Sequence, residues 1–391
     1  MLGCMQRKLR LLFTVLGFCT ILASSGCRHA TQPAPPGTAA GSGPHSKPSG
    51  APSLPQKKTS LHHTQTHNVA ILIDTTTAMN GVDMTCHVTN LECVLAAART
   101  LLANLVPCKP ITPSCSGDKG IPSDPVDMVT VFTFPNVTVD SELHNYDCSS
   151  INPTVSQYVF PSPGALSYAP LPSAMRPDRL VTYQVVPFSN DYLEPGPDHA
   201  LNPDSNLVRA LGGKPGCPPM KAPGGMGTFY AGAIYAAQAS LAAERAVRPG
   251  SLNVMIFVND GFANSSRAQM DSTPGGATNL GVYPSWLNEC SQGIAAAKSA
   301  TAAGTRVYSV AYRAITHPCV TEISAPVDSL TTCSTMAGIA SSDQYFYSAV
   351  TSAPQVGDCL SGDRSHNNPD LNAIFRQIAQ SIRKHPSRLP K

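Results

Sequence analysis

From Asn68 onward, short apolar runs alternate along the chain with segments whose apolar residues recur at helical spacing. Short continuous apolar runs suit strands buried on both faces, and the helical segments between them suit crossover helices. The alternation therefore predicts an α/β fold with a doubly wound, mostly parallel sheet. The expected strands are 69–73, 128–134, 180–187, 252–258, 306–312 and 345–347, and the expected helices are 91–105, 205–211, 228–247, 286–303, 336–340 and 371–382.

Local signals mark where several of these helices begin and end. Thr89 and Glu92 have the spacing of a capping box, in which each side chain binds the backbone N–H of the other residue. Pro107 ends the helical pattern that follows, and Gly304 ends a later one.

Residues 1–26 have the pattern of a signal peptide. Arg7, Lys8 and Arg10 form a basic start, and an apolar stretch of twelve residues, 11–22, follows. Because a helix needs about 20 residues to cross a bilayer, we expect a cleaved signal peptide, with an uncleaved anchor as the alternative.

Cys27 directly follows Ser-Ser-Gly, which resembles a bacterial lipobox, although Ser24 stands where that motif has Leu. A lipid on this cysteine would anchor the chain to a membrane without a spanning helix. Cleavage after Ser25, with Ala23 at the minus-three position, is the alternative.

Residues 28–67 are rich in Pro, Gly, Ser, Ala, Thr and His and almost lack large apolar side chains. Such a composition cannot bury enough surface to offset the entropy lost on ordering, so we predict a disordered tether. His62, His63 and His67 are interpreted as solvated tether residues, with metal binding as the alternative.

The remaining body, residues 68–385, is expected to be one domain, followed by a short tail at 386–391. Its segment from about 107 to 225 is irregular and rich in Pro and Tyr, and is interpreted as a large disulfide-braced insertion around two or three strands.

Charge excludes one class of partner. The chain has 27 basic and 24 acidic residues, and three basic but no acidic residues lie in 1–26, which leaves 24 of each sign. A neutral chain without a basic stripe is not expected to bind nucleic acid.

Cysteine usage indicates an oxidising compartment, since ten of the 13 cysteines lie beyond Cys27 and none form the paired spacing of a zinc site. We predict disulfides among Cys86, Cys93, Cys108, Cys115, Cys148, Cys217, Cys290, Cys319, Cys333 and Cys359. Pairing is not fixed by sequence; Cys108–Cys115 and Cys319–Cys333 are expected as local loops.

Oxygen-bearing side chains follow three of the predicted elements at corresponding places. Asp74 and Thr76 follow the first strand, Thr228 follows a glycine-rich turn before a helix, and Asp260 ends the strand at 252–258. Loops at the carboxyl ends of parallel strands converge on one crevice, so we expect these four residues to share a site for Mg²⁺ or another divalent cation. The alternative is structural: Asp74 and Thr228 would cap helices, and Asp260-Gly261 would form a turn.

In their order and spacing, these motifs resemble the von Willebrand factor type A (vWA) domain and its metal-ion-dependent adhesion site. Segments 73–79, 223–237, 307–312 and 371–379 are more closely similar to TadG-like bacterial proteins associated with tight-adherence pili. The resemblance spans about 68–383 and implies Asp74, Thr76, Thr228 and Asp260 as metal ligands. Two positions depart from it: Ala78 replaces an expected serine ligand, and the N-terminus has a signal-peptide pattern.

The resemblance implies a non-enzymatic adhesion module in the bacterial cell envelope, whose cation binds a carboxylate of a protein or cell-surface ligand. An alternative is a metal-independent scaffold whose interface is the disulfide-braced insertion. A secreted hydrolase is a remote alternative, because neither Gly-x-Ser-x-Gly nor His-Glu-x-x-His occurs.

Overall fold

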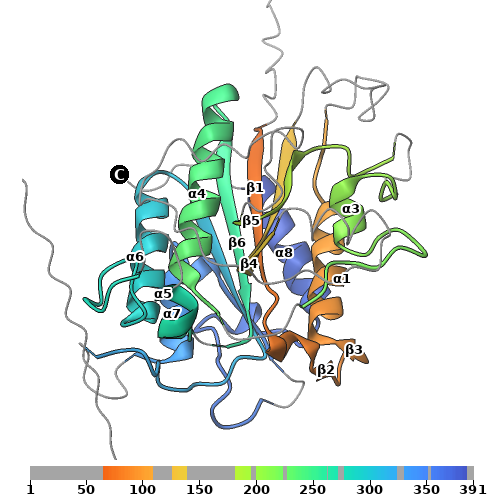
Figure 1. Ribbon diagram of the computed structural model, residues 1–391. Coiled ribbons are helices and arrows are strands. Elements are labelled where there is room, and N and C mark those ends of the chain that lie inside the picture. Colours follow the sequence, from red (N-terminus) through yellow and green to blue (C-terminus); the bar gives the residue numbers. More distant parts are fainter. Residues whose placement is uncertain are drawn as a thin grey trace, which may run out of the picture. The chain divides into compact units, whose positions relative to one another are not determined.

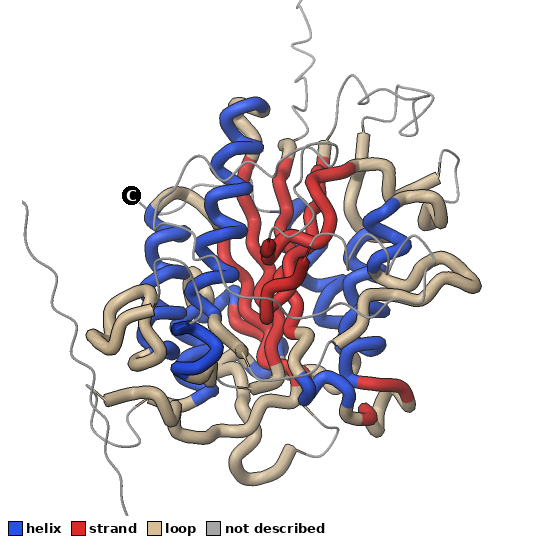
Figure 2. The backbone as a smooth tube through the Cα atoms, viewed as in Figure 1, coloured by secondary structure: helices blue, strands red, loops and turns tan. Residues whose placement is uncertain are grey.

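A six-stranded sheet, in the order β5-β4-β1-β6-β7-β8, lies at the centre of the described chain (Figures 1 and 2). Its strands are β1 (His67–Asp74), β4 (Asp127–Thr138), β5 (Val181–Ser189), β6 (Leu252–Asn259), β7 (Arg306–Tyr312) and β8 (Phe346–Ala349). All neighbours are parallel except β5, which pairs antiparallel with β4 at the edge. The predicted α/β fold with a doubly wound, mostly parallel sheet is therefore confirmed.

The computed structural model describes residues 65–108, 126–138, 181–194, 200–222, 227–261, 263–271, 277–323, 330–350 and 354–384. The signal-peptide segment, Cys27, the tether up to residue 64, the 386–391 tail and much of the 107–225 insertion lie outside these residues. Within them, no helix is long and apolar enough to cross a membrane.

Helices cover both faces of the sheet (Figure 1). One face packs against α1 (Asn90–Leu102), α3 (Asn206–Ala210) and α8 (Leu371–Lys384). The other packs against α4 (Tyr230–Val247), α6 (Glu289–Ala302) and α7 (Thr332–Ile339), with the short α5 (Arg267–Asp271) beside them. The remaining elements are the 3₁₀ turns η1 (Thr77–Asn80), η3 (Asp343–Tyr345) and η4 (Arg364–His366), and a small ribbon of β2 (Val82–Asp83) and β3 (Val88–Thr89).

The central strand β1 shows why the apolar runs form this sheet. Every residue of β1 is buried; Val69, Ile71 and Ile73 pack in the core on the α1 and α8 side, whereas Ala70 and Leu72 pack in the core on the α4 and α6 side. Because side chains alternate between the faces of a strand, a continuous apolar run supplies both cores.

The structure confirms the capping box before α1 and the glycine that ends α6. Thr89 caps α1, and Thr89 and Glu92 form both hydrogen bonds of the capping box. Gly304 follows α6 with a φ of +89°, a conformation that favours glycine.

His67 is not a tether residue, so that interpretation is wrong. It is the first residue of β1, only 3% exposed, and its Nδ1 lies 2.7 Å from Oδ1 of Asp127. β1 and β4 pair His67 opposite Asp127, so the sheet register brings these two side chains together.

Each disulfide between two described cysteines lies at the carboxyl edge of the sheet. Cys86–Cys93 joins the β2–β3 ribbon to α1, Cys290–Cys319 joins the start of α6 to the loop after β7, and Cys333–Cys359 joins the start of α7 to the loop after β8. The predicted Cys319–Cys333 loop is therefore wrong, because each of these cysteines binds a partner from another segment. Cys108 and Cys217 are also disulfide-bonded, and Cys115 and Cys148 lie outside the described residues.

The contact between α4 and α6 generates a stability prediction. A Cβ added at Gly293 of α6 would lie 2.9 Å from Cβ of Tyr230 at the start of α4. Helix propensity favours alanine by about 1 kcal/mol, but overpacking costs about 1–3 kcal/mol. We expect Gly293→Ala to lower the free energy of unfolding by about 1 kcal/mol in chemical denaturation.

Gly362→Ala is the control, because a Cβ there meets nothing within 4 Å. Its effect should stay within about 0.5 kcal/mol. A Gly293→Ala variant more stable than the unsubstituted protein would contradict the close packing of the two helices.

Candidate metal centre

The carboxyl ends of β1 and β6 lie side by side where the winding of the sheet reverses. β1 is the first strand in the chain, and successive connections lead from it to β4 and β5 on one side and to β6, β7 and β8 on the other. Ile73 pairs with Val258, so the two strands end at the same level. Ligands of doubly wound sheets bind in the crevice at this reversal, and Asp74 and Asp260 are the carboxylates that flank it.

Asp74 ends β1 and is almost completely buried, with 1% exposure. Its Oδ1 accepts a hydrogen bond of 2.7 Å from the backbone N–H of Thr76. Burial raises the pKa of Asp74 well above its ordinary value, and the negative charge of Asp260 raises it further. Hydrogen bonds from Thr76 offset only part of this effect. The charged neighbour of Asp74 is thus another carboxylate.

Asp260 follows the last residue of β6, and burial raises its pKa to about 6. Its Oδ1 is buried and has no hydrogen-bond partner. Leaving such an oxygen unpaired away from water is costly. Two neighbouring buried acids with an unpaired oxygen suit a bound cation, which would neutralise both.

The two threonines proposed as ligands are also buried. Thr76, which precedes η1 as its N-cap, is 7% exposed, and Thr228 is 4% exposed. The carbonyl of Thr228 accepts a 3.2 Å hydrogen bond from the N–H of Asn264, which lies just beyond Asp260. Phe229, not Thr228, precedes α4 as its N-cap, so the interpretation of Thr228 as a helix cap is wrong.

Tyr230 is a residue of this site that the sequence motifs did not indicate. Its hydroxyl donates a 2.8 Å hydrogen bond to the carbonyl of Gly261 and accepts one from Asn259. Burial, followed by the charges of Asp74, Asp260 and Glu289, raises the pKa of Tyr230 well above its ordinary value. Its position two residues after Thr228 was the available signal.

Aromatic rings line the protein interior below the acids. The rings of Phe134 and Phe257 stack at 5.0 Å, and Tyr230 packs edge-on against Phe257 at the same separation. Such apolar surroundings keep water away and strengthen electrostatic interactions at the carboxylates.

Ala78 is exposed and contributes no side-chain oxygen. Its backbone carbonyl accepts hydrogen bonds from the N–H of Gly81 and, at 3.2 Å, from the Asn90 side chain. The loop that carries Ala78 is therefore held in place by its backbone, and the side chain projects where a serine would add one hydroxyl.

Within the described ranges, one group of three metal-ligating residues has ligand atoms within 4.8 Å of one another, namely Asp83, Cys86 and Cys93. The two cysteines are bonded to each other. Asp83 accepts hydrogen bonds from the N–H groups of Thr85 and Cys86 and from the Tyr312 hydroxyl, and lies 3.2 Å from Arg313. This group braces the β2–β3 ribbon and leaves no ligands for a metal.

Comparisons with known proteins give likenesses of structure only. This chain is similar to the pilus adhesin SpaC from Lactobacillus rhamnosus GG, with 12% identity and a TM-score of 0.41 over 82% of this chain, which spans 31% of that adhesin. It is also similar to the conserved hypothetical protein BatB from Bacteroides thetaiotaomicron, with 13% identity and a TM-score of 0.36 over 81% of this chain and 98% of that one.

A third likeness is to the manganese-loaded TRAP protein of Plasmodium vivax, with 9% identity and a TM-score of 0.32 over 73% of this chain and 69% of that one. No family model and no curated protein matches the chain. At such low identities and TM-scores these likenesses carry no weight for function.

The raised pKa values generate a prediction about stability and pH. An acid whose pKa is raised by folding adds stability at low pH, and that contribution is lost as the pH rises through its folded value. For Asp260 the loss falls between pH of about 4 and 6 and reaches up to about 3 kcal/mol. Asp74→Asn removes an acid whose pKa is raised by burial and by the charge of Asp260, so in EDTA it should be more stable than the unsubstituted protein at pH 8, with the advantage shrinking towards pH 4.

Chemical denaturation at several pH values across this range measures the free energy of unfolding of both proteins. Asp343→Asn, at an exposed aspartate remote from the crevice, is the control and should follow the unsubstituted protein throughout. An Asp74→Asn variant that is less stable than the unsubstituted protein at pH 8 in EDTA would contradict the repulsion between the two acids.

Proposed function

We propose that this chain is an exported, non-enzymatic binding module that uses a divalent cation to bind a carboxylate of a protein partner. The observation that carries this proposal is the pair of buried acids, Asp74 and Asp260, at the reversal point of the sheet. Two adjacent buried carboxylates without a positive neighbour are costly unless a cation joins them.

Asp74 and Asp260 would hold the cation through carboxylate oxygens, and Thr76 and Thr228 through hydroxyls. Mg²⁺ suits this set, since it prefers oxygen ligands and commonly takes only one or two carboxylates, with waters in the remaining positions. A bound cation would supply a positive charge at this end of the sheet. A carboxylate of a partner would be a suitable further ligand for it.

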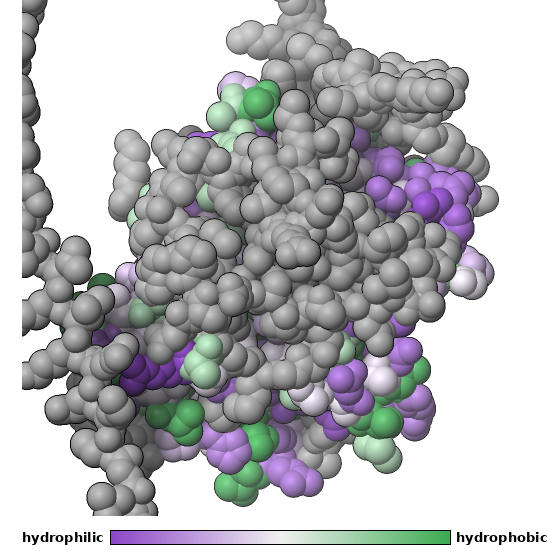
Figure 3. Space-filling model, in the orientation of Figure 1, coloured by the Kyte–Doolittle hydropathy of each residue, from purple (hydrophilic) through white to green (hydrophobic). Residues whose placement is uncertain are grey.

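The surroundings of the crevice favour a protein as the partner. Large apolar side chains are exposed on loops and the small ribbon at this edge, including Val82 (65% exposed), Met84 (71%), Leu280 (74%) and Val320 (72%). Figure 3 shows apolar residues among polar ones at this lower end of the molecule. Exposed apolar groups rimmed by polar residues are typical of protein-binding surfaces.

The disulfides support an exported protein, because such bonds persist in oxidising compartments. We place the chain in the bacterial cell envelope, held by a lipid on Cys27 that the residues between Cys27 and β1 connect to the domain. Its motif resemblance to TadG-like proteins supports a role in pilus or surface assembly.

A metal-independent scaffold is the second candidate function, and Ala78 favours it because one expected ligand is missing. In that case the insertion between 107 and 225 would supply the interface. Asp74→Ala separates the two candidates, since it would abolish binding through the cation but leave a scaffold interface intact.

The proposal predicts that binding to cell surfaces requires a divalent cation. We expect the purified protein to bind target surfaces in Mg²⁺, to be released by EDTA, and to rebind when Mg²⁺ is restored. Asp74→Ala should bind at background level in all three conditions. Binding that persists in EDTA would exclude the cation-dependent mechanism and favour the scaffold.

The exposed loop at Ala78 generates a second prediction. Ala78→Ser should raise Mg²⁺ affinity about tenfold, roughly 1.4 kcal/mol, because it adds a hydroxyl ligand. Isothermal titration calorimetry measures the change. Ala78→Val, which adds a branch without oxygen, is the control and should not raise the affinity; equal affinities for the serine and valine variants would show that this position does not face the cation.

A further inference from the structure

A second concentration of buried oxygen atoms lies at the first turn of α6. Glu289 is completely buried, with 0% exposure, and within the described part of the chain neither of its carboxylate oxygens has a hydrogen-bond partner of normal geometry. A buried carboxylate is normally paired or bound to a metal, because an unpaired charge in the protein interior is very unfavourable. The first metal centre does not account for this residue.

Ser265 faces the Glu289 carboxylate. Burial is the largest effect and raises the pKa of Glu289 well above its ordinary value. Contacts with the backbone and the hydroxyl of Ser265 lower that pKa but offset only part of the effect of burial. Neither Glu289 oxygen nor the Ser265 hydroxyl forms a hydrogen bond of normal geometry. The carboxylate and the hydroxyl thus lie near each other with their oxygens unpaired. The charged neighbour of Glu289 is Glu322, of the same sign.

The unpaired buried atoms of this edge are all oxygens. Within the described part of the chain they include Oδ1 of Asn259, Asp260 and Asn264, Oγ of Ser265 and both carboxylate oxygens of Glu289. Asn264 adjoins Ser265 and donates its backbone N–H to Thr228. A gathering of buried oxygens, with the Ser265 hydroxyl as its one side-chain donor, suits a hard cation and disfavours an anion.

Glu289 is distinct from the Asp74–Asp260 pair. Among the described residues, these three carboxylates do not form a single group whose ligand atoms all lie within 4.8 Å of one another. Burial and the negative charges of all three acids raise the pKa of Tyr230. Tyr230 also packs against Gly293, which lies one turn along α6 from Glu289. Its hydroxyl donates to the carbonyl of Gly261 and therefore does not serve Glu289.

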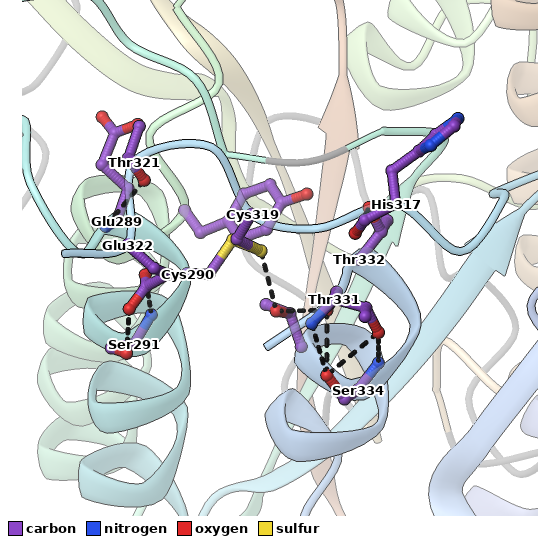
Figure 4. The surroundings of a disulfide bond; sticks show 12 residues. Glu289, Cys290, Ser291, His317, Cys319, Thr321, Glu322, Thr331, Thr332 and Ser334 are labelled. Atoms are coloured by element: carbon purple, nitrogen blue, oxygen red, sulfur yellow. Dashed lines mark hydrogen bonds between the residues drawn. A yellow bond between two sulfur atoms is a disulfide. The ribbon is translucent and has the colours of Figure 1, made fainter. Parts of the chain in front are cut away.

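Covalent and hydrogen bonds fix the backbone that carries Glu289 (Figure 4). The next residue, Cys290, is bonded to Cys319, and the N–H of Glu289 donates to Oγ1 of Thr321 at 3.2 Å. The preceding Asn288 accepts the N–H of Ile323 with its side chain at 2.8 Å. With its backbone held in this way, Glu289 does not reach solvent by a shift of the first turn.

We propose that Glu289 and Ser265, assisted by Asn264, form a second site for a hard divalent cation such as Ca²⁺, beside the first centre and separated from it by Tyr230. Waters would fill the remaining positions, as they commonly do around such ions. A cation here neutralises Glu289 and fixes Asn264 and Ser265, which follow Asp260 in the chain. This inference does not require the first centre to be occupied.

The test compares stability with and without calcium in the purified full-length protein. In EDTA at pH 8, Glu289→Gln should be at least as stable as the unsubstituted protein, because it removes an uncompensated buried charge. In millimolar Ca²⁺ the unsubstituted protein should gain several degrees in Tm, and Glu289→Gln should lose most of that gain. Ser265→Ala should lose part of it.

Glu244→Gln is the matched control, since Glu244 is a carboxyl near the far end of α4 whose pKa burial also raises. It should respond to Ca²⁺ like the unsubstituted protein. A Glu289→Gln variant that is destabilised equally in EDTA and in Ca²⁺ would overturn the proposal and assign Glu289 a purely structural role.

Terbium luminescence separates the two sites. Trp286 is the one tryptophan of the chain and lies three residues before Glu289, so exciting it should sensitise Tb³⁺ bound there. Asp74→Asn should retain this signal, Glu289→Gln should lose it, and Ca²⁺ should abolish it by displacing Tb³⁺.

If Asp74→Asn abolishes the signal and Glu289→Gln leaves it unchanged, only the first centre binds metal and the second site is excluded. If Asp74→Asn has no effect on any cation response while Glu289→Gln does, the second site stands and the first centre fails.

Discussion

The repulsion between two buried acids at neighbouring strand ends is the constraint on which the candidate site depends. Parallel pairing of β1 with β6 brings the ends of both strands to the same level, at the point where the winding of the sheet reverses. Asp74 and Asp260 cannot separate without breaking that pairing. The sheet therefore holds two acids close together in a buried setting, which favours either protonation of one acid or a cation between them.

The sheet and the loops of this protein are stabilised in different ways, and the disulfides belong to the loops. The sheet is held by ladder hydrogen bonds and by two apolar cores, one on each face. The loops at its carboxyl edge lack this ladder of hydrogen bonds and expose several apolar side chains. Cross-links at Cys86–Cys93, Cys290–Cys319 and Cys333–Cys359 hold the segments that surround the crevice.

The parts of the fold that depend on local pattern were predictable from the sequence. The strands, most of the helices and the Thr89–Glu92 cap correspond to periodicity and to single-residue signals. The meeting of Asp74 with Asp260 was also predictable, since it follows from the general geometry of parallel sheets. The structure places all four expected ligands at one edge, and whether they bind a metal remains a prediction.

Features that depend on contacts between distant segments were not predictable. His67 was expected in the tether because the residues before it are polar and rich in histidine. Only its pairing with Asp127, the first residue of β4, reveals it as part of the sheet. Cys319 pairs with Cys290 because α6 returns to the loop after β7. Tyr230 and Glu289 carry no motif, and their importance appears only once their burial and neighbours are known.

The position of β1 has a mechanical consequence. The chain enters the sheet at His67, at the end of β1 opposite the crevice, and β1 is hydrogen-bonded along its length to β4 and β6. Tension between the N-terminal side of the chain and a ligand at Asp74 would run along this strand. Such tension loads both ladders in shear, so their hydrogen bonds resist together instead of breaking one at a time. The same central strand that aligns the acids is thus built to carry a pulling force through the middle of the protein.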